Sequence, residues 1–217
     1  MNDIPRSKIV YDNLFNGFFK YRHVVPVTKK LSDEEFYNQM NRQKYVFIIT
    51  KIDEEFNKNE YDYLHIKPIY IVLLSELNEN SSRTSFLLGL KEKIKKIGKD
   101  KNPEIIFIVD KDTSSALGDV LRKHNIYMYH YVKFAIIFPE CSQADEHRIM
   151  TPSEVEEFTH RLRLTTKNKL NKILKDDTMV IWIGAKVDDL IEMKRISETT
   201  IYSYEYRLVK NKTLTSE

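Results

Sequence analysis

The stretch from Asp177 to Val209 reads DTMVIWIGAKVDDLIEMKRISETTIYSYEYRLV, and it decides the fold of the C-terminal part of the chain. It is dense in β-branched and aromatic residues, which favour strands. Three strand-like runs are predicted within it: Met179 to Ile183, Leu190 to Lys194, and Tyr202 to Val209. A small sheet is therefore expected at this end of the chain.

A helix is predicted to precede this sheet. Thr151-Pro152-Ser153-Glu154 combines an N-cap residue, a proline at the first helical position and a capping-box glutamate. The segment from Arg161 to Lys175 has six basic residues and no acidic one, so it is either a solvated face or a surface for nucleic acid or an acidic partner. Pro139 to Glu146 is the predicted linker, which gives an N-terminal domain at 1–140 and a small α+β domain at 145–217.

The chain before the linker alternates helical and strand-like patterns. Ser7 to about Tyr21 repeats apolar residues at helical spacing, and Ser32 with Glu35 forms a capping box that starts a second helix. This alternation is typical of an α/β layer, which is the fold class predicted for the N-terminal domain. The expected strands are 45–50, 69–74, 105–109, 126–129 and 134–138, and further helices are expected at 82–97 and from Thr113.

Composition argues against several classes of protein. The net charge of +3 is too small to mark a stand-alone nucleic-acid binder. The single cysteine, Cys141, has no partner for an internal disulfide, and no apolar run approaches the roughly 20 residues that span a membrane. The N-terminus lacks the apolar run of a signal peptide. The six histidines are scattered and no Cys/His spacing matches a zinc site, so no metal site is expected.

The C-terminal stretch resembles the assembly domain of the fifth shared subunit of eukaryotic and archaeal-type RNA polymerases. Asn171, Thr178 and Ile196 replace prolines of the family pattern, and Asp188 and Ile201 stand where relatives usually carry glycine. Proline and glycine are placed for backbone reasons, so these departures bear on the turns. The matching positions are His147, Thr151, Leu170-Asn171-Lys172-Ile173, Asp177-Thr178, Trp182-Ile183-Gly184, Ile191 to Arg195, Ser197-Glu198-Thr199 and Tyr206-Arg207.

This resemblance implies a non-catalytic structural subunit of a multisubunit DNA-dependent RNA polymerase, which binds no cofactor. Its C-terminal domain would anchor on the largest subunit, among other polymerase subunits, through a strand-and-turn surface bearing Trp182, Arg195, Glu198 and Arg207. Exposed apolar surface is expected there, because a stable interface buries about 800 Å² per partner. The residues expected at the interface are His147, Asp177, Trp182, Gly184, Arg195, Ser197, Glu198, Thr199, Tyr206 and Arg207.

By the same resemblance, the N-terminal domain is expected to be a jaw of restriction-endonuclease-like topology that faces downstream double-stranded DNA. Ile105 to Val109 and then Thr113-Ser114-Ser115-Ala116 are similar to the family's strand and helix-opening turn. A helix N-terminus presents unpaired N–H groups that suit a phosphate, although Thr113 can equally be a plain N-cap. The expected DNA-facing residues are Lys111, Thr113, Ser114, Arg122 and Lys123.

Two other functions stay open: a nuclease or free-standing DNA-binding protein that reuses the jaw fold, and a transcription adaptor. Glu192 and Lys194 lie on one face of a predicted strand, as restriction-type nucleases require, but such a site also needs an aspartate on a neighbouring strand and this pair falls in the C-terminal domain. In the N-terminal domain, Asp110 follows a strand, but no Glu-x-Lys accompanies it on a following strand. The plainer interpretation is the polar face of a half-buried strand, with Ile191 and Met193 inward.

Trp182 adds an indication of origin. It precedes Ile183-Gly184 where cellular members of the family mostly carry tyrosine, and in this it is similar to versions encoded by large nucleocytoplasmic DNA viruses. A viral homologue is therefore predicted, located in the virion and the host cytoplasm. A cellular homologue would be nuclear.

Overall fold

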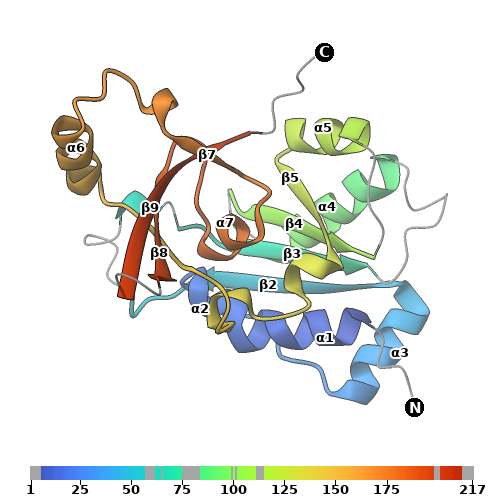
Figure 1. Ribbon diagram of the computed structural model, residues 1–217. Helices are drawn as coiled ribbons and strands as arrows, with labels where there is room; N and C mark the ends of the chain where they lie inside the picture. The colour runs from blue at the N-terminus through green and yellow to red at the C-terminus, as the bar shows by residue number, and fades with distance from the viewer. Residues whose placement is uncertain are drawn as a thin grey trace. The chain divides into compact units, whose positions relative to one another are not determined.

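The computed structural model describes residues 6–56, 62–64, 66–74, 84–98, 100, 102–110, 115–197 and 201–211. They form two compact units, each with its own sheet (Figure 1). Unit 1 takes the described residues of 1–56 and 66–137, and unit 2 takes those of 57–65 and 138–217. The mixed α/β class is confirmed. The segment around Tyr63 joins the C-terminal unit, which the sequence did not indicate.

Unit 1 contains a five-stranded sheet in the order β1-β2-β3-β4-β5. The first three strands are antiparallel, whereas β3, β4 and β5 are parallel. The strands are β1 (Val24–Pro26), β2 (Tyr45–Ile52), β3 (Ile69–Leu74), β4 (Glu104–Val109) and β5 (Ile126–His130). The helices are α1 (Arg6–Asn13), the π-helix η1 (Leu14–Phe18), α2 (Phe19–Tyr21), α3 (Asp33–Gln43), α4 (Thr84–Gly98) and α5 (Ser115–Lys123).

The central strands β3 and β4 are buried along their whole length, as expected for parallel strands covered on both faces. Leu87, Leu90 and Ile94 of α4 pack with Leu121 of α5 on one face. The first helix contacts β3 on the opposite face. The helix predicted from Ser7 to Tyr21 is confirmed, with a π-helical turn in its middle.

The strand predicted at 134–138 is wrong. The chain forms two 3-10 turns there, η3 (Tyr131–Phe134) and η4 (Phe138–Glu140). Proline lacks the N–H that a strand ladder requires, and Pro139 falls inside the second turn. Phe134 is buried against the ring of Phe18, with the ring centroids 5.3 Å apart, so its apolar character reflects core packing. The helix predicted to open at Thr113 begins at Ser115 within the described residues, and Thr113 lies outside them.

Unit 2 contains a four-stranded sheet in the order β6-β8-β9-β7. The strand β8 is antiparallel to both β6 and β9, and β7 is parallel to β9. The predicted strands near the C-terminus are confirmed as β8 and β9, whereas β6 and β7 were not predicted. The elements are η2 (Asp62–Leu64), β6 (Glu146–Ile149), α6 (Pro152–Arg161), η5 (Lys167–Lys169), β7 (Asn171–Leu174), α7 (Thr178–Ile183), β8 (Leu190–Ser197) and β9 (Ile201–Lys210).

The strand predicted from Met179 to Ile183 is also wrong, because this run is the short helix α7. Asp177 caps its start, with the side chain accepting a hydrogen bond from the backbone N–H of Met179 at 2.9 Å. Gly184 ends it in the left-handed conformation, at φ 76°. Four of its six residues are buried, so the run is apolar throughout and its periodicity is hidden.

The backbone explains why relatives carry glycine at two positions. The N–H of Asp188 donates to the carbonyl of Val209, and the N–H of Val209 donates to that of Asp189. Two residues thus face one across the ladder, a β-bulge whose first residue usually is a left-handed glycine. Asp188 occupies that place at φ 74°, and Ile201, at the start of β9, has φ 65°. A left-handed conformation is unusual for any residue with a side chain and worst for a β-branched one.

Replacing Ile201 with glycine should therefore stabilise the protein, by up to about 1 kcal/mol. Left-handed strain costs about 1–2 kcal/mol, and the greater freedom of glycine in the unfolded chain takes part of this gain back. Because Ile201 is 72% exposed, little apolar burial is lost. Asp188→Gly is the matched control and should gain less, since aspartate tolerates this conformation and Asp188 binds Lys210 at 2.6 Å. Urea unfolding of the three proteins measures this, and a loss of stability in Ile201→Gly would contradict the strain.

The predicted capping box of α6 is confirmed and extends into an ion-pair network. Thr151 accepts from the backbone N–H of Glu154, and Glu154 accepts from that of Thr151. Arg148 of β6 binds Glu154 at 2.9 Å and Glu192 of β8 at 2.8 Å. The Arg148 side chain, followed by the backbone N–H of Thr151, lowers the pKa of Glu154 from 4.5 to about 2. The network links the start of α6 to the sheet.

This network makes stability depend on pH in a defined window. Because the pKa of Glu154 is lowered in the folded protein, its carboxylate stabilises the fold above about pH 4.5. This stabilisation is lost as the pH falls towards 2. Near neutral pH, the free energy of unfolding of Glu154→Gln should be about 1 kcal/mol lower than that of the wild type. The effect is modest because the carboxylate is partly solvated. The difference between the two proteins should vanish as the pH approaches 2. The urea unfolding midpoints of the two proteins across this pH range test the prediction. A difference between the midpoints that does not change with pH would refute it.

Candidate subunit interface

The sheet of unit 2 narrows from four strands to two. The strand β6 pairs with residues 191–194 of β8, and β7 pairs with residues 207–210 of β9. Beyond these partners, β8 and β9 continue as a two-stranded hairpin as far as the pair Ser197 and Ile201. A two-stranded hairpin is only marginally stable in water, so this part of the sheet gains most from an added partner.

One face of the hairpin, called here the tyrosine face, consists of Lys194, Ile196, Tyr202 and Tyr204. The ladder register pairs Ile196 with Tyr202 and Lys194 with Tyr204, which places all four on the same side. Ile196 is 79% exposed and Tyr204 54% exposed, whereas Tyr206, further along this face, packs on Phe158 of α6. The helix α6 therefore covers one end of the face and leaves the rest open.

Ion pairs hold the opposite face of the hairpin. Arg195 binds one oxygen of Asp145 through both Nε, at 3.0 Å, and Nη2, at 2.8 Å. Arg207 donates to both oxygens of Glu205, which lowers the pKa of that carboxyl. Arg195 and Arg207 thus form ion pairs within unit 2, and exposed pairs of this kind add little stability. Their place at a subunit interface stays a prediction. Arg195 also lies 3.9 Å from Glu205, which is an ionic contact between β8 and β9.

The structure does not bring all the predicted interface residues to a surface. Trp182 is fully buried in α7, so the prediction that a strand-and-turn surface bears its side chain is wrong. Asp177 and Gly184 cap the two ends of the same helix. His147 lies in β6, with its Nδ1 2.7 Å from the carbonyl of Asp145, beside the end of the hairpin. Ser197 ends β8, and Glu198 and Thr199 lie outside the described residues.

The strongest surface candidates were missed by sequence reasoning. Ile196, Tyr202 and Tyr204 were not predicted at the interface, because the resemblance points to the charged and turn residues around them. A usable indication was present: Ile201 and the tyrosines place apolar side chains on both faces of the strand at its outer end. A sheet with one solvated face does not need this pattern, so an additional partner was indicated.

Of the residues predicted to face DNA, only two can be placed. Arg122 and Lys123 lie exposed in the last turn of α5, and Arg122 binds Asp119 at 2.5 Å. Lys111, Thr113 and Ser114 lie outside the described residues. Whether these five residues form one surface therefore stays a prediction.

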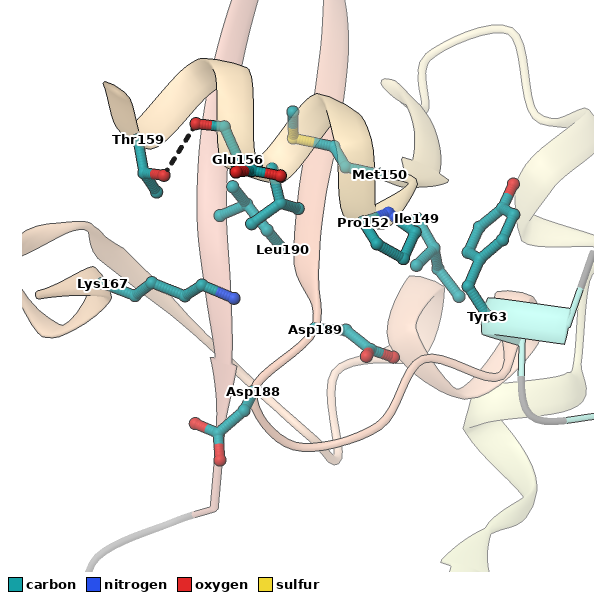
Figure 2. Close-up of a pocket in the computed structure, with 11 residues that line it drawn as sticks. Tyr63, Ile149, Met150, Pro152, Glu156, Thr159, Lys167, Asp188, Asp189 and Leu190 are labelled. Carbon is teal, nitrogen blue, oxygen red and sulfur yellow. Dashed lines mark hydrogen bonds between the residues drawn. The ribbon is translucent and has the colours of Figure 1, made fainter. Parts of the chain in front are cut away.

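Unit 2 also contains a pocket of about 440 Å³ (Figure 2). Ile149, Val155 and Leu190 supply apolar walls. Lys167 of η5 and Asp188 before β8 also line the pocket, and Lys210 binds the Asp188 carboxylate at 2.6 Å. Asp189 is already engaged, since it accepts a hydrogen bond from the backbone N–H of Lys186 at 2.6 Å. The remaining lining residues are Tyr63, Met150, Pro152, Glu156 and Thr159.

The structure does not favour the nuclease alternative. Glu192 and Lys194 share a face of β8, with Ile191 and Met193 buried on the other, as predicted. However, Glu192 is bound by Arg148. Within the described residues, no group of three or more histidine, cysteine or acidic side chains is placed to hold a metal ion. Among those same residues, no helix has the length and apolar character to cross a membrane.

Comparison with known proteins identifies the same part of the chain. Residues 140–209 match the family described as RNA polymerase Rpb5, C-terminal domain. A DNA-directed RNA polymerase RPB5 homolog of African swine fever virus is 31% identical over 117 residues, which cover 49% of this chain and 56% of that protein. The chain thus spans little more than half the length of its viral relatives.

Two archaeal proteins are more alike over a shorter stretch. The DNA-directed RNA polymerase subunit Rpo5 of Thermococcus celer is 42% identical over 64 residues, which cover 30% of this chain and 77% of that protein. The corresponding protein of Thermococcus kodakarensis is 44% identical over the same shares. These matches cover most of each archaeal protein.

Proposed function

This chain belongs to the Rpb5/Rpo5 family of RNA polymerase subunits, and we propose that it is a non-catalytic structural subunit of a multisubunit DNA-dependent RNA polymerase. The observation that carries this proposal is the identity of 42% to an archaeal Rpo5 protein across 77% of that protein's length. Those relatives are named as polymerase subunits, and unit 2 presents an exposed apolar hairpin that suits assembly. Chemistry and its metal ions would belong to other subunits of the enzyme.

Unit 2 would anchor the chain on the largest polymerase subunit through the tyrosine face. Aromatic side chains dominate the binding energy of protein interfaces, and Tyr202 and Tyr204 stand next to the exposed Ile196. Lys194 lies 4.4 Å from the centre of the Tyr202 ring, so a cation–π contact fixes that ring before any partner binds. Such pre-ordering reduces the entropic cost of association. Arg195 and Arg207 would border the contact.

Unit 1 would form part of the jaw that holds downstream DNA. Its parallel strands β3, β4 and β5 are compatible with the restriction-endonuclease-like topology proposed for it. The DNA-facing residues would be Arg122 and Lys123 at the end of α5, together with Lys111, Thr113 and Ser114. Contacts of this type are sequence-independent and weaken as salt rises.

A viral source fits two observations. The chain is 31% identical to an RPB5 homolog from African swine fever virus, and Trp182 stands where cellular members mostly carry tyrosine. The protein would then act in the virion and the host cytoplasm, in a transcription complex encoded by the same virus.

The tyrosine face can be tested by charge. The double variant Ile196→Lys/Tyr204→Lys should recover the catalytic subunits at roughly one tenth of the wild-type yield or less, because two central apolar contacts are replaced by cations. Both side chains are exposed, so the thermal unfolding midpoint should change little. Val132→Lys, at an exposed apolar position of unit 1, is the matched control and should recover wild-type amounts. Equal recovery by the double variant would rule out this face as the anchor.

A further inference from the structure

The hydrogen bonds of β9 determine to which side each backbone N–H and C=O group of the strand points. Val209 exchanges hydrogen bonds with the start of β8, so its N–H and C=O point towards that strand. Lys210 points the other way, since its carbonyl accepts from the N–H of Lys175 at 2.9 Å, next to β7. Because these groups alternate along a strand, Tyr204 directs its N–H and C=O to the same side as Lys210. Ser203 directs its own to β8.

The side of β9 that Tyr204 faces has no strand at that level among the described residues. The strand β7 begins at Asn171, which lies opposite Arg207, and the chain before it turns away through η5. Backbone polar groups at an open edge are a template for another strand. The edge from Ile201 to Glu205, called here the open edge, contains neither lysine nor proline, the usual protection of such edges. Its isoleucine and tyrosines instead favour strand pairing.

The other side of the hairpin is covered. Glu146 of β6 lies opposite Lys194, and Asp145 just before it holds Arg195 through two hydrogen bonds. The approach to β8 is thus blocked as far as Arg195. Among the described residues, the longer uncovered stretch for strand addition is therefore the open edge of β9, because beyond this cover only Ile196 of β8 turns its backbone groups to the other side.

We propose that a partner polypeptide adds a short extended segment to the open edge of β9, in line with β7, so that the sheet becomes three strands wide around the hairpin. The inference rests on the proposed function, because the partner would be another polymerase subunit. It goes beyond packing on the tyrosine face, since main-chain hydrogen bonds at Tyr204 supply part of the affinity. The segment would alternate apolar and polar residues, with its apolar residues beside the Tyr202 and Tyr204 rings.

Charge further restricts the segment. A strand laid along the open edge ends beside Asn171, close in sequence to Lys169 at the end of η5 and Lys172 of β7. Both are exposed residues of a run that has no acidic member from Arg161 to Lys175. The partner segment would therefore carry acidic residues at the end that faces β7. A second copy of the open edge, with Glu205 as its single acidic residue, matches this charge poorly.

The test distinguishes the contribution of the Tyr204 backbone N–H to partner binding from the contribution of its ring. Tyr204→Val and Tyr204→Pro both remove the ring, but only proline removes the N–H that faces the open edge. Proline is tolerated where the missing N–H faces away from the ladder, so both variants should unfold at similar midpoints. Each tagged chain is co-expressed with the catalytic polymerase subunits, and the complex is quantified after purification. Tyr204→Pro should recover roughly tenfold less of the polymerase complex than Tyr204→Val does. This is the expected effect of losing one interface hydrogen bond whose acceptor stays buried.

Each outcome has one meaning. Equal recovery by the two variants overturns strand addition while leaving the subunit assignment intact, provided that the wild-type chain recovers the complex. Failure of the wild-type chain itself overturns the proposed function and, with it, this inference. If the wild-type chain dimerises and Tyr204→Pro abolishes the dimer, then a second copy of the chain occupies the open edge. This result overturns the proposal that another polymerase subunit supplies the added strand. Reduced recovery by Lys169→Glu/Lys172→Glu supports the acidic end of the segment, and wild-type recovery by that variant overturns it.

Discussion

Replacement of Trp182 by alanine is expected to lower the free energy of unfolding of unit 2 by about 3–5 kcal/mol, the usual cost of truncating a buried large aromatic side chain. Trp182 is fully buried in α7, where its neighbours Val180 and Ile183 belong to the apolar cluster of this unit. The loss is large relative to a typical total stability of about 5–15 kcal/mol. The unit should then be partly unfolded at physiological temperature, and assembly should fail for that reason.

Urea unfolding followed by far-ultraviolet circular dichroism measures the effect. Trp182 is the single tryptophan of the chain, so the fluorescence of the wild-type protein reports the unfolding of unit 2 specifically. Trp182→Phe is the matched variant and should lose clearly less, because an aromatic ring still fills most of the space. A Trp182→Ala protein as stable as the wild type would mean that α7 does not pack as described.

Removal of the Glu104 carboxylate should destabilise unit 1 by a similar amount, about 3–5 kcal/mol. Glu104 begins β4, and its Oε2 accepts a hydrogen bond from Nη2 of Arg22 at 2.5 Å. Both side chains are only 8% exposed. In Glu104→Ala the guanidinium would remain buried with its main counter-charge gone, although it still lies over the Phe18 ring.

A double variant separates the cost of a broken pair from the worth of the pair. Arg22→Met/Glu104→Leu removes both charges and keeps much of the volume, so it should recover most of the stability that Glu104→Ala loses. Circular dichroism across a urea gradient compares the three proteins. If Glu104→Ala unfolds at the wild-type midpoint, or if the double variant is no better than the single one, then Arg22 is not held as a desolvated charge.

Sequence reasoning succeeded where local chemistry and long periodicity agreed. The capping boxes at Ser32 and Thr151 start α3 and α6 as predicted, and the apolar run from Ile69 to Leu74 is a buried strand with those bounds. The glycine positions taken by Asp188 and Ile201 prove to be left-handed, which is the physical reason for the family's choice.

It failed where an apolar run was short and buried on all sides. Met179 to Ile183 has the composition of a strand, and only its caps, Asp177 and Gly184, reveal a helix of less than two turns. The strand β7 was missed because it has four residues and three of them are exposed, and it is defined by its pairing with β9, which local sequence does not encode.

The candidate interface shows the same limit. The resemblance points to the part of the chain that contains the exposed hairpin, and the role of Arg195 and Arg207 at an interface stays a prediction. Exposure, however, depends on which side chains the rest of the sheet covers. Trp182 is conspicuous in the sequence and is buried, whereas Tyr204 is ordinary in the sequence and lies open beyond the reach of α6. The direction of its backbone follows from the ladder register, which becomes known only when the strands are paired.

The central claim is that this chain is a structural subunit of an RNA polymerase, and native purification tests it most directly. The chain would be isolated through a tag at Met1, its partners identified and quantified by mass spectrometry, and promoter-independent RNA synthesis measured on the same material. We expect two very large polymerase subunits at equal stoichiometry with the chain, together with RNA synthesis. Recovery of the chain alone, or with regulatory proteins and no catalytic subunits, would contradict the claim.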